Sequence, residues 1–254
     1  MEEIEVVERK RMNIQDAYVI DGFPSVGLVG SISANYLVSF LGLEEIAIMD
    51  SVHFPSVSLV RGGRPQAPVR IYWGQKGDDK IVVLVSEFPP PAELMKPLAK
   101  TIMDWFEENR CRLIISPEGL VIGEAEAGAG RGIPKEAVVF GIGSTASAVS
   151  VLKGNDIPVF ENGVIVGLAG VLLNEGVNRN DDVIVLLSEA HAEYPDARAA
   201  AAVTAAIDRI LLGIEVDITP LLAEAAKIED KLKDIYKKAG KKDELTKMRS
   251  VMYG

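Results

Sequence analysis

Short apolar runs rich in β-branched residues alternate along the chain with longer stretches whose apolar residues recur every three or four positions. This alternation is typical of an α/β domain, because the two periods match one face of a strand and one face of a helix. Several short runs, such as residues 81–85, are apolar throughout, which indicates a central sheet covered on both faces. The strands are predicted over Ala17–Asp21, Glu45–Asp50, Pro68–Trp73, Ile81–Ser86, Leu113–Pro117, Ala137–Gly141 and Asp182–Leu187.

The helices are predicted over Ser31–Leu41, Ala92–Asn109, Thr145–Lys153, Leu168–Glu175 and Ala197–Leu212. The segment Ser56–Val85 differs from the rest, because it carries turn signals at Gly62-Gly63 and at Gly77-Asp78-Asp79. A meander or hairpin there would add antiparallel neighbours to the sheet. We therefore predict an α/β fold with a mixed, mostly parallel sheet.

After Gly213 the pattern changes to that of one amphipathic helix, beginning near Asp217-Ile218-Thr219-Pro220 with proline in its first turn. Its apolar stripe comprises Ile218, Leu221, Leu222, Ala225, Ile228, Leu232 and Ile235. Two interpretations stay open, since short heptad runs occur both in helices that pack on their own domain and in subunit interfaces. We divide the chain into an α/β domain over residues 1–213 and, over residues 214–254, this helix followed by a tail that we expect to be mobile.

Composition and charge exclude several classes of protein and of binding partner. The 254 residues suit one or two domains, and 48% hydrophobic with 25% charged residues excludes intrinsic disorder. The formal net charge of −10, without a segregated basic patch, disfavours nucleic acid as a partner. No apolar run reaches the length of a membrane span, the start Met1-Glu2-Glu3-Ile4-Glu5 lacks the regions of a signal peptide, and the single Cys111 fits a reducing compartment. We expect a cytoplasmic protein with neither nucleic acid nor membrane as partner.

The candidate catalytic motifs are incomplete. Gly22–Gly27 comes near the Gly-x-Ser-x-Gly elbow of serine hydrolases, but its spacing is wrong by one residue. His191 has no second histidine at the spacing of a zinc helix, so a solvated loop is the better interpretation. The segment 141–146 matches a dinucleotide glycine spacing, with Glu161 near the place of the ribose-binding acid, but the helix after it is short and a tight strand-to-helix turn is favoured. We expect no catalysis, no cofactor and no metal ion.

The most distinctive segment is Gly22–Gly30, GFPSVGLVG, which follows the first predicted strand and leads into a helix containing Asn35-Tyr36-Leu37. Together with Asp21 it resembles the opening signature of the proteasome assembly chaperone family, especially its archaeal members. The resemblance continues in order through Asp50–Pro55, Ser86–Pro89, Gly141–Thr145 and Asn162–Gly170. It therefore covers nearly the whole domain, from about Asp21 to Leu212.

This resemblance implies a three-layer α/β/α sandwich similar to the purine nucleoside phosphorylase fold, used for protein binding instead of catalysis. It also implies a homo-oligomer, of four or five subunits by analogy with the family, that assists assembly of the proteasome core or binds its α subunits.

The last three residues agree with this implication. Many proteasome activators and assembly chaperones end in a hydrophobic residue, a tyrosine and any residue with a free carboxylate, and Met252-Tyr253-Gly254 has that form. Such a tail presents an apolar anchor, a phenol that can hydrogen-bond and an anion that can pair with a lysine. We expect Met252, Tyr253 and Gly254 to be the partner-binding residues.

One alternative function stays open. An enzyme on a phosphorylase-like scaffold, or a carboxylate-amine ligase, would hold a phosphate or nucleotide at Gly22–Gly30, because a glycine-rich strand-to-helix turn lets backbone amides approach an anion. The shortage of clustered His, Lys and Arg near that loop speaks against it, since anionic substrates usually need cationic partners.

Overall fold

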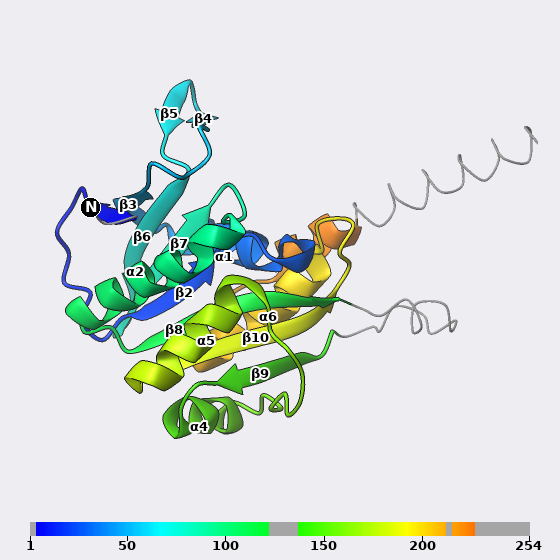
Figure 1. The fold of residues 1–254 in the computed structure, drawn as a ribbon. Coiled ribbons are helices and arrows are strands. Elements are labelled where there is room, and N and C mark those ends of the chain that lie inside the picture. Colours follow the sequence, from blue (N-terminus) through cyan, green and yellow to red (C-terminus); the bar gives the residue numbers. More distant parts are fainter. Residues whose placement is uncertain (1–3, 122–136, 212–214, 227–254) are drawn as a thin grey trace, which may run out of the picture.

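A mixed sheet of eight strands runs through the middle of the computed structural model, which describes residues 4–121, 137–211 and 215–226 (Figure 1). The strand order across the sheet is β1-β3-β6-β7-β2-β8-β10-β9. In that order the strands are Glu5–Glu8, Glu44–Asp50, Val69–Lys76, Asp79–Ser86, Tyr18–Gly22, Leu113–Val121, Val183–Ala190 and Val139–Gly143. All seven predicted strands are present, and β1 is an edge strand that the prediction missed.

The parallel part of the sheet is smaller than predicted. Only the central strands β7, β2, β8 and β10 pair in parallel, whereas β1–β3, β3–β6, β6–β7 and β10–β9 are antiparallel. β6 and β7 are antiparallel because a tight turn at Gly77 joins them, with Lys76 paired with Asp79. So short a connection can join only antiparallel strands. The sheet is therefore mixed, with its parallel strands in the middle.

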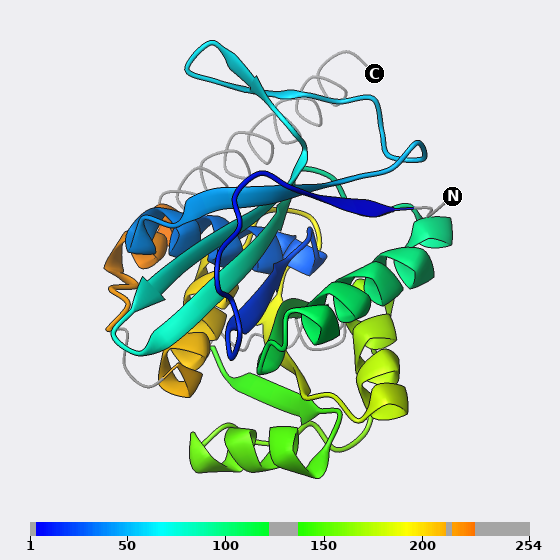
Figure 2. The ribbon, with the colours of Figure 1, turned by 90° about the vertical axis from the view of Figure 1, so that its left-hand side faces the viewer.

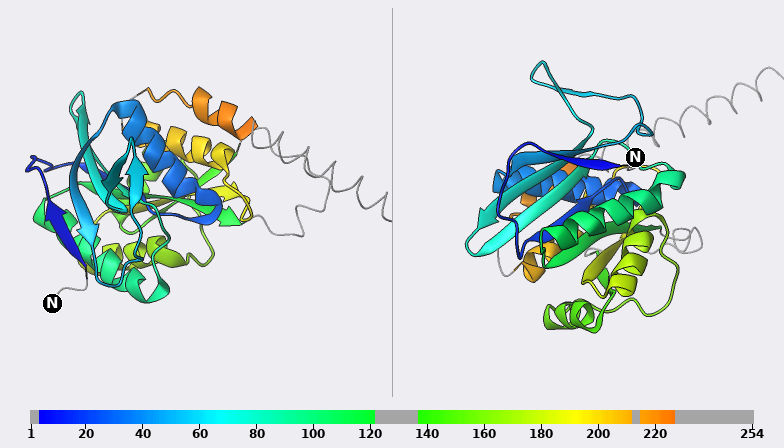
Figure 3. Two further views of the ribbon diagram at one scale, coloured as in Figure 1. Left: turned by 90° about the horizontal axis from the view of Figure 1, so that it is seen from above. Right: turned by 60° about the vertical axis from the view of Figure 1, so that its left-hand side comes forward.

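Helices cover both faces of the sheet (Figures 2 and 3). Residues of α1 (Val29–Leu41) and α6 (Ala197–Ile210) join one buried apolar cluster, and those of α2 (Met95–Glu108) and α5 (Gly167–Arg179) join another on the opposite face. The short α4 (Ala146–Gly154) packs beside the edge strand β9. All five helices predicted for the domain are present, so the α/β prediction is confirmed.

The strands and helices follow their sequence patterns. Every residue of β2 is buried, as are the last six of β7, which is why these segments are apolar rather than alternating. In α2 the buried positions recur at helical spacing, and the 3₁₀ turn Ala92–Leu94 after Pro91 leads into it. None of the helices within the described residues is long and apolar enough to cross a membrane.

One element lies outside the main sheet. The strands β4 (Leu59–Arg61) and β5 (Arg64–Gln66) form a separate two-stranded hairpin around Gly62 and Gly63, as the turn signals predicted. Figures 1 and 2 show this hairpin projecting from the body of the molecule beyond the ends of β3 and β6.

Candidate functional site

The carboxyl ends of the central parallel strands form the edge at which the chain leaves the sheet in different directions. β2 continues into α1 on one face, whereas its neighbour β7 continues into α2 on the other. Ligand sites of open α/β sheets lie at such points, because diverging connections leave a crevice above the strand ends. The fold itself therefore places a candidate site at this carboxyl edge.

Asp21, in β2, is a buried carboxyl group at the carboxyl edge. Ser116 Oγ donates to Asp21 Oδ2 at 2.8 Å, and the backbone N–H of Phe23 donates to Asp21 Oδ1 at 3.1 Å. The strand register places Ser116 beside Asp21, because the preceding residues Ile20 and Ile115 are paired between β2 and β8. Burial raises the pKa of Asp21 to about 6, although both hydrogen bonds act in the opposite direction.

Glu118 follows Ser116 by two positions in β8 and so lies on the same face of the strand. Burial raises the pKa of Glu118 to about 8, the charge of Asp21 adds to the shift, and a hydrogen bond with Ser25 opposes it. At neutral pH this pair of carboxyl groups therefore retains a proton. Chemically it can donate and accept hydrogen bonds.

The sequence prediction included Asp21 only as part of the family signature and missed Ser116 and Glu118. Their signal was present: Ser116 is a polar residue inside an otherwise apolar predicted strand, and Glu118 follows that strand directly. A polar side chain in a buried strand needs a specific partner, which here is Asp21.

The loop Gly22–Gly30 is shaped by its own hydrogen bonds. The N–H of Leu28 donates to the Ser25 carbonyl at 2.9 Å, and the N–H of Gly30 donates to Ser25 Oγ at 3.1 Å. Gly27 adopts a positive φ of 60° and lies against Ala190 and Asp196, so no side chain would fit there. The N–H groups of Leu28 and Gly30 are therefore already engaged within the loop, and the carboxyl groups beside them would repel an anion.

His191 has a structural role in the loop that precedes α6. Its Nδ1 lies 2.8 Å from Asp196 Oδ2, and its ring stacks on Tyr194. Asp196 also accepts the N–H of Ala199 as the N-cap of α6 and donates its own N–H to the Gly27 carbonyl. Among the described residues, no Ser-His-Asp arrangement is formed with Ser25.

The segment 141–146 is a tight strand-to-helix turn, as favoured from the sequence. A Cβ on Gly143 would lie 2.7 Å from the backbone nitrogen of Val149, so the glycine allows α4 to approach β9 closely. Thr145 caps α4 by accepting from the N–H of Ala148, and its hydroxyl donates to Asp182. Because β9 is antiparallel to β10, this turn lies at the opposite end of the sheet from the carboxyl edge.

The predicted partner-binding residues Met252, Tyr253 and Gly254 lie outside the described residues, as does the predicted helix beyond residue 226. Of that helix, residues 219–226 are described and helical. Leu221 and Ala225 are buried there, whereas Leu222 is 42% exposed. The Tyr36 hydroxyl of α1 donates to the Asp217 carbonyl, so the described start of this helix packs on its own domain.

A family model described as the PAC2 family matches residues 19–236. The chain belongs to the PAC2 family. This match spans the sheet except β1 and Tyr18, the first residue of β2. It includes the carboxyl-edge residues Asp21, Ser25, Ser116 and Glu118. It confirms the resemblance to proteasome assembly chaperones that the sequence motifs predicted.

Two solved structures from Pyrococcus furiosus are similar to this PAC2 protein along its length. PbaA, an archaeal homologue of proteasome-assembly chaperone, is 30% identical with a TM-score of 0.80, covering 99% of both chains. PbaB, an archaeal proteasome activator, is 27% identical with a TM-score of 0.80, covering 93% of this chain and all of PbaB. An uncharacterized protein of Methanocaldococcus jannaschii is 27% identical over 92% of each chain.

Proposed function

We propose that this PAC2 protein is a non-catalytic binding protein of the proteasome core particle that assists its assembly or activation through contacts with α subunits. The observation that carries the proposal is the similarity to PbaA and PbaB over nearly the whole chain, since both of those proteins are connected with the proteasome. The geometry of the carboxyl edge supports a binding role, because the N–H groups of Leu28 and Gly30 and the side chain of Ser25 are engaged in internal hydrogen bonds.

The C-terminal tail is the proposed contact. Met252 supplies an apolar anchor, Tyr253 an aromatic ring with a hydrogen-bonding hydroxyl, and Gly254 a carboxylate that pairs with a lysine of the α ring. Residues 241–249 carry alternating charges and only Leu245 and Met248 as large apolar side chains, which suits a tether.

The proposed function includes association of several copies of this chain. Three residues bind weakly on their own, so a homo-oligomer of four or five copies gains affinity by presenting several tails to one ring. The predicted helix Ile218–Ala239 is suited to projecting those tails from the α/β domain, because its described start is held against α1 through Tyr36 and Asp217.

Removal of residues 252–254 tests the tail. The shortened protein is expected to keep the thermal stability and mass of the intact one, because the last residues of a chain in general contribute little to folding. Its binding to isolated proteasome α subunits, measured by pull-down, is expected to fall sharply. Tyr253→Ala should reproduce most of the loss, and one extra residue after Gly254 should weaken binding by moving the carboxylate out of register.

Met248→Ala is the matched control, since it removes an apolar side chain of the same segment outside the tripeptide. It should bind as the intact protein does. Undiminished binding by the shortened protein would mean that the α/β domain carries recognition and that the tail proposal is wrong.

A further inference from the structure

The helix α1 carries no charge. No residue from Gly22 to Leu43 is charged, although 25% of the residues of the whole chain are. In contrast, α2, α4, α5, α6 and the described start of the C-terminal helix each contain charged residues. A helix at the surface of a soluble protein normally has charged residues on its outer face, so the outer face of α1 is unusual for one that remains in water.

Large apolar side chains follow this outer face at helical spacing. Ile32, Tyr36 and Phe40 are four residues apart, so they lie on one side of the helix, and none of them is buried. Phe40 is 38% exposed, and its ring stacks on that of Tyr36 with 5.9 Å between the ring centroids. We name these three residues, together with Leu28 directly before the helix, the α1 stripe. Aromatic side chains without charged neighbours are typical of the centre of a protein–protein interface.

The first residue of the stripe has an unfavourable backbone conformation. Leu28 adopts φ 53° and ψ 26°, in the left-handed region that bulky residues seldom occupy. Its side chain is nevertheless 41% exposed, so burial within a single chain offsets little of this cost. Backbone strain of this kind gathers at functional positions. Contact of Leu28 with another protein would supply the burial that the single chain does not.

The segment beside α1 also exposes an apolar side chain. The start of the C-terminal helix lies against α1, because the Tyr36 hydroxyl donates to the Asp217 carbonyl. In this helix Leu221 is buried, whereas Leu222 is 42% exposed. The exposed apolar surface therefore includes the start of the C-terminal helix as well as α1.

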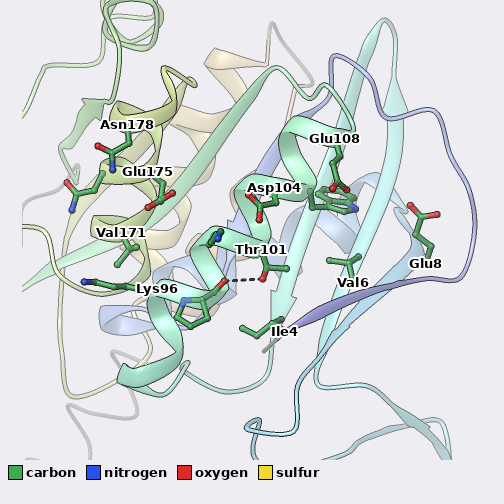
Figure 4. Close-up of a pocket in the computed structure, with 14 residues that line it drawn as sticks. Ile4, Val6, Glu8, Lys96, Thr101, Asp104, Glu108, Val171, Glu175 and Asn178 are labelled. Carbon is green, nitrogen blue, oxygen red and sulfur yellow. Dashed lines mark hydrogen bonds between the residues drawn. The ribbon is translucent and has the colours of Figure 1, made fainter. Parts of the chain in front are cut away.

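The helices on the opposite face of the sheet present a charged surface instead. Figure 4 shows a groove between β1, α2 and α5. Its lining includes four carboxylates and two lysines: Glu8, Asp104, Glu108, Glu175, Lys96 and Lys100. Another protein that covered this groove would have to remove these charged groups from water and pair each of them again. The α1 stripe can be covered without that cost.

The charge of the whole chain indicates which partner the stripe fits. With a formal net charge of −10, two copies of the chain repel each other overall. They approach at the lowest electrostatic cost where both surfaces are uncharged, and α1 provides such a surface on each copy. A partner of opposite charge would instead be attracted to the acidic surfaces outside α1. The stripe is therefore best suited to a second copy of this chain.

We propose that the α1 stripe packs against the α1 stripe of a second copy across a two-fold axis. A contact between identical surfaces joins the copies in pairs. It therefore favours four subunits over five, because a ring of five identical subunits has no two-fold axis. This inference rests on the homo-oligomer of the proposed function and assigns a contact surface to it.

Leu28→Asn combined with Phe40→Lys tests this pairing in the full-length protein. Asparagine removes the apolar side chain but tolerates the left-handed backbone, and lysine places a charge in the contact of each copy. We expect self-association to weaken by about tenfold or more, measured as the mass from light scattering across a dilution series. Phe40→Lys alone should also weaken it, and this single variant decides the test if the double variant does not fold.

Val177→Lys is the matched control, because Val177 is 61% exposed on α5, which lies on the opposite face of the sheet. It should keep the native mass, and thermal unfolding verifies that each variant folds. The inference would be overturned by a native protein that is monomeric or has an odd number of subunits. Unchanged mass of the stripe variants would overturn it too, and if their thermal stability fell as well, the stripe would be covered by its own chain.

Binding to isolated proteasome α subunits, measured separately on the same variants, distinguishes this inference from the proposed function. The stripe variants should still bind through the tail, with lower apparent affinity because fewer tails act together. Loss of α-subunit binding with unchanged mass would overturn the inference, since the stripe would then contact the proteasome. Undiminished binding by the Tyr253→Ala variant would count against the tail proposal and leave the stripe pairing standing.

Discussion

At the scale of single residues, the carboxyl pair at the carboxyl edge makes stability depend on pH. Folding raises the pKa of Asp21 to about 6 and that of Glu118 to about 8, both above their ordinary values. The folded protein therefore binds more protons than the unfolded chain between pH 4 and pH 8. Stability contributed by these groups is fully present below pH 4 and is lost as the pH rises through the folded pKa values.

Glu118→Gln should remove most of this dependence. Glutamine keeps the shape of the side chain and can hydrogen-bond to Ser25, but it never becomes ionised. We expect the variant to melt at a temperature higher than the native protein by roughly 5 °C at pH 9, with little difference at pH 5. Thermal unfolding followed by circular dichroism at several pH values measures this.

Glu193→Gln serves as the control, because Glu193 is exposed in the loop before α6. Its melting temperature should track that of the native protein at every pH. A native protein whose stability stayed constant from pH 5 to pH 9 would contradict the account of the carboxyl pair.

The hydrogen bond between Ser116 and Asp21 shows what could and could not be predicted from the sequence at the residue scale. Polar residues at the ends of apolar strands were visible, but their pairing depends on strand order. Asp21 and Ser116 are 95 positions apart and meet only because β2 and β8 are neighbours. In contrast, the caps Thr145 and Asp196 act within three residues along the chain, where sequence patterns are informative.

At the scale of elements, the carboxyl-edge loop depends on how closely α1 approaches the sheet. Gly22 ends β2 at the point where Ala34 of α1 and the carbonyl of Leu84 in β7 converge. A Cβ at this position would collide with both atoms, one of them in the backbone. We infer that this glycine serves close packing of a helix on two strands.

Gly22→Ala should therefore lower the free energy of unfolding by about 3 kcal/mol, because the backbone of β7 cannot yield without disturbing the sheet. The matched control is Gly154→Ala, since a Cβ on Gly154 meets nothing within 4 Å. Urea unfolding measures both, and the control should differ little from the native protein. Equal stability of the Gly22→Ala variant would mean that α1 and the sheet have room between them.

Most elements could be predicted from the sequence because their apolar patterns match one buried face or complete burial. The exceptions have physical reasons. β1 is short and its burial pattern is mostly exposed, so it lacks the apolar run of a buried strand. The number of antiparallel strand pairs depends on which strands become neighbours in the sheet. Only the turn at Gly77 indicated such a pair from the local sequence.

At the scale of the whole molecule, the proposed function joins an α/β domain similar to PbaA and PbaB to a C-terminal segment that we expect to bind the proteasome. The described start of the C-terminal helix lies against α1, and the tripeptide Met252-Tyr253-Gly254 ends the sequence of that segment. We propose that copies of the chain associate and that their tripeptides bind the proteasome.

The most direct test of this account is capture of isolated proteasome α subunits by the full-length protein, followed by mass measurement of the captured complex. We expect a complex that contains α subunits together with several copies of this chain. This complex should be lost when the Tyr253→Ala variant is used in place of the native protein. Absence of any complex at micromolar concentrations of both proteins would contradict it.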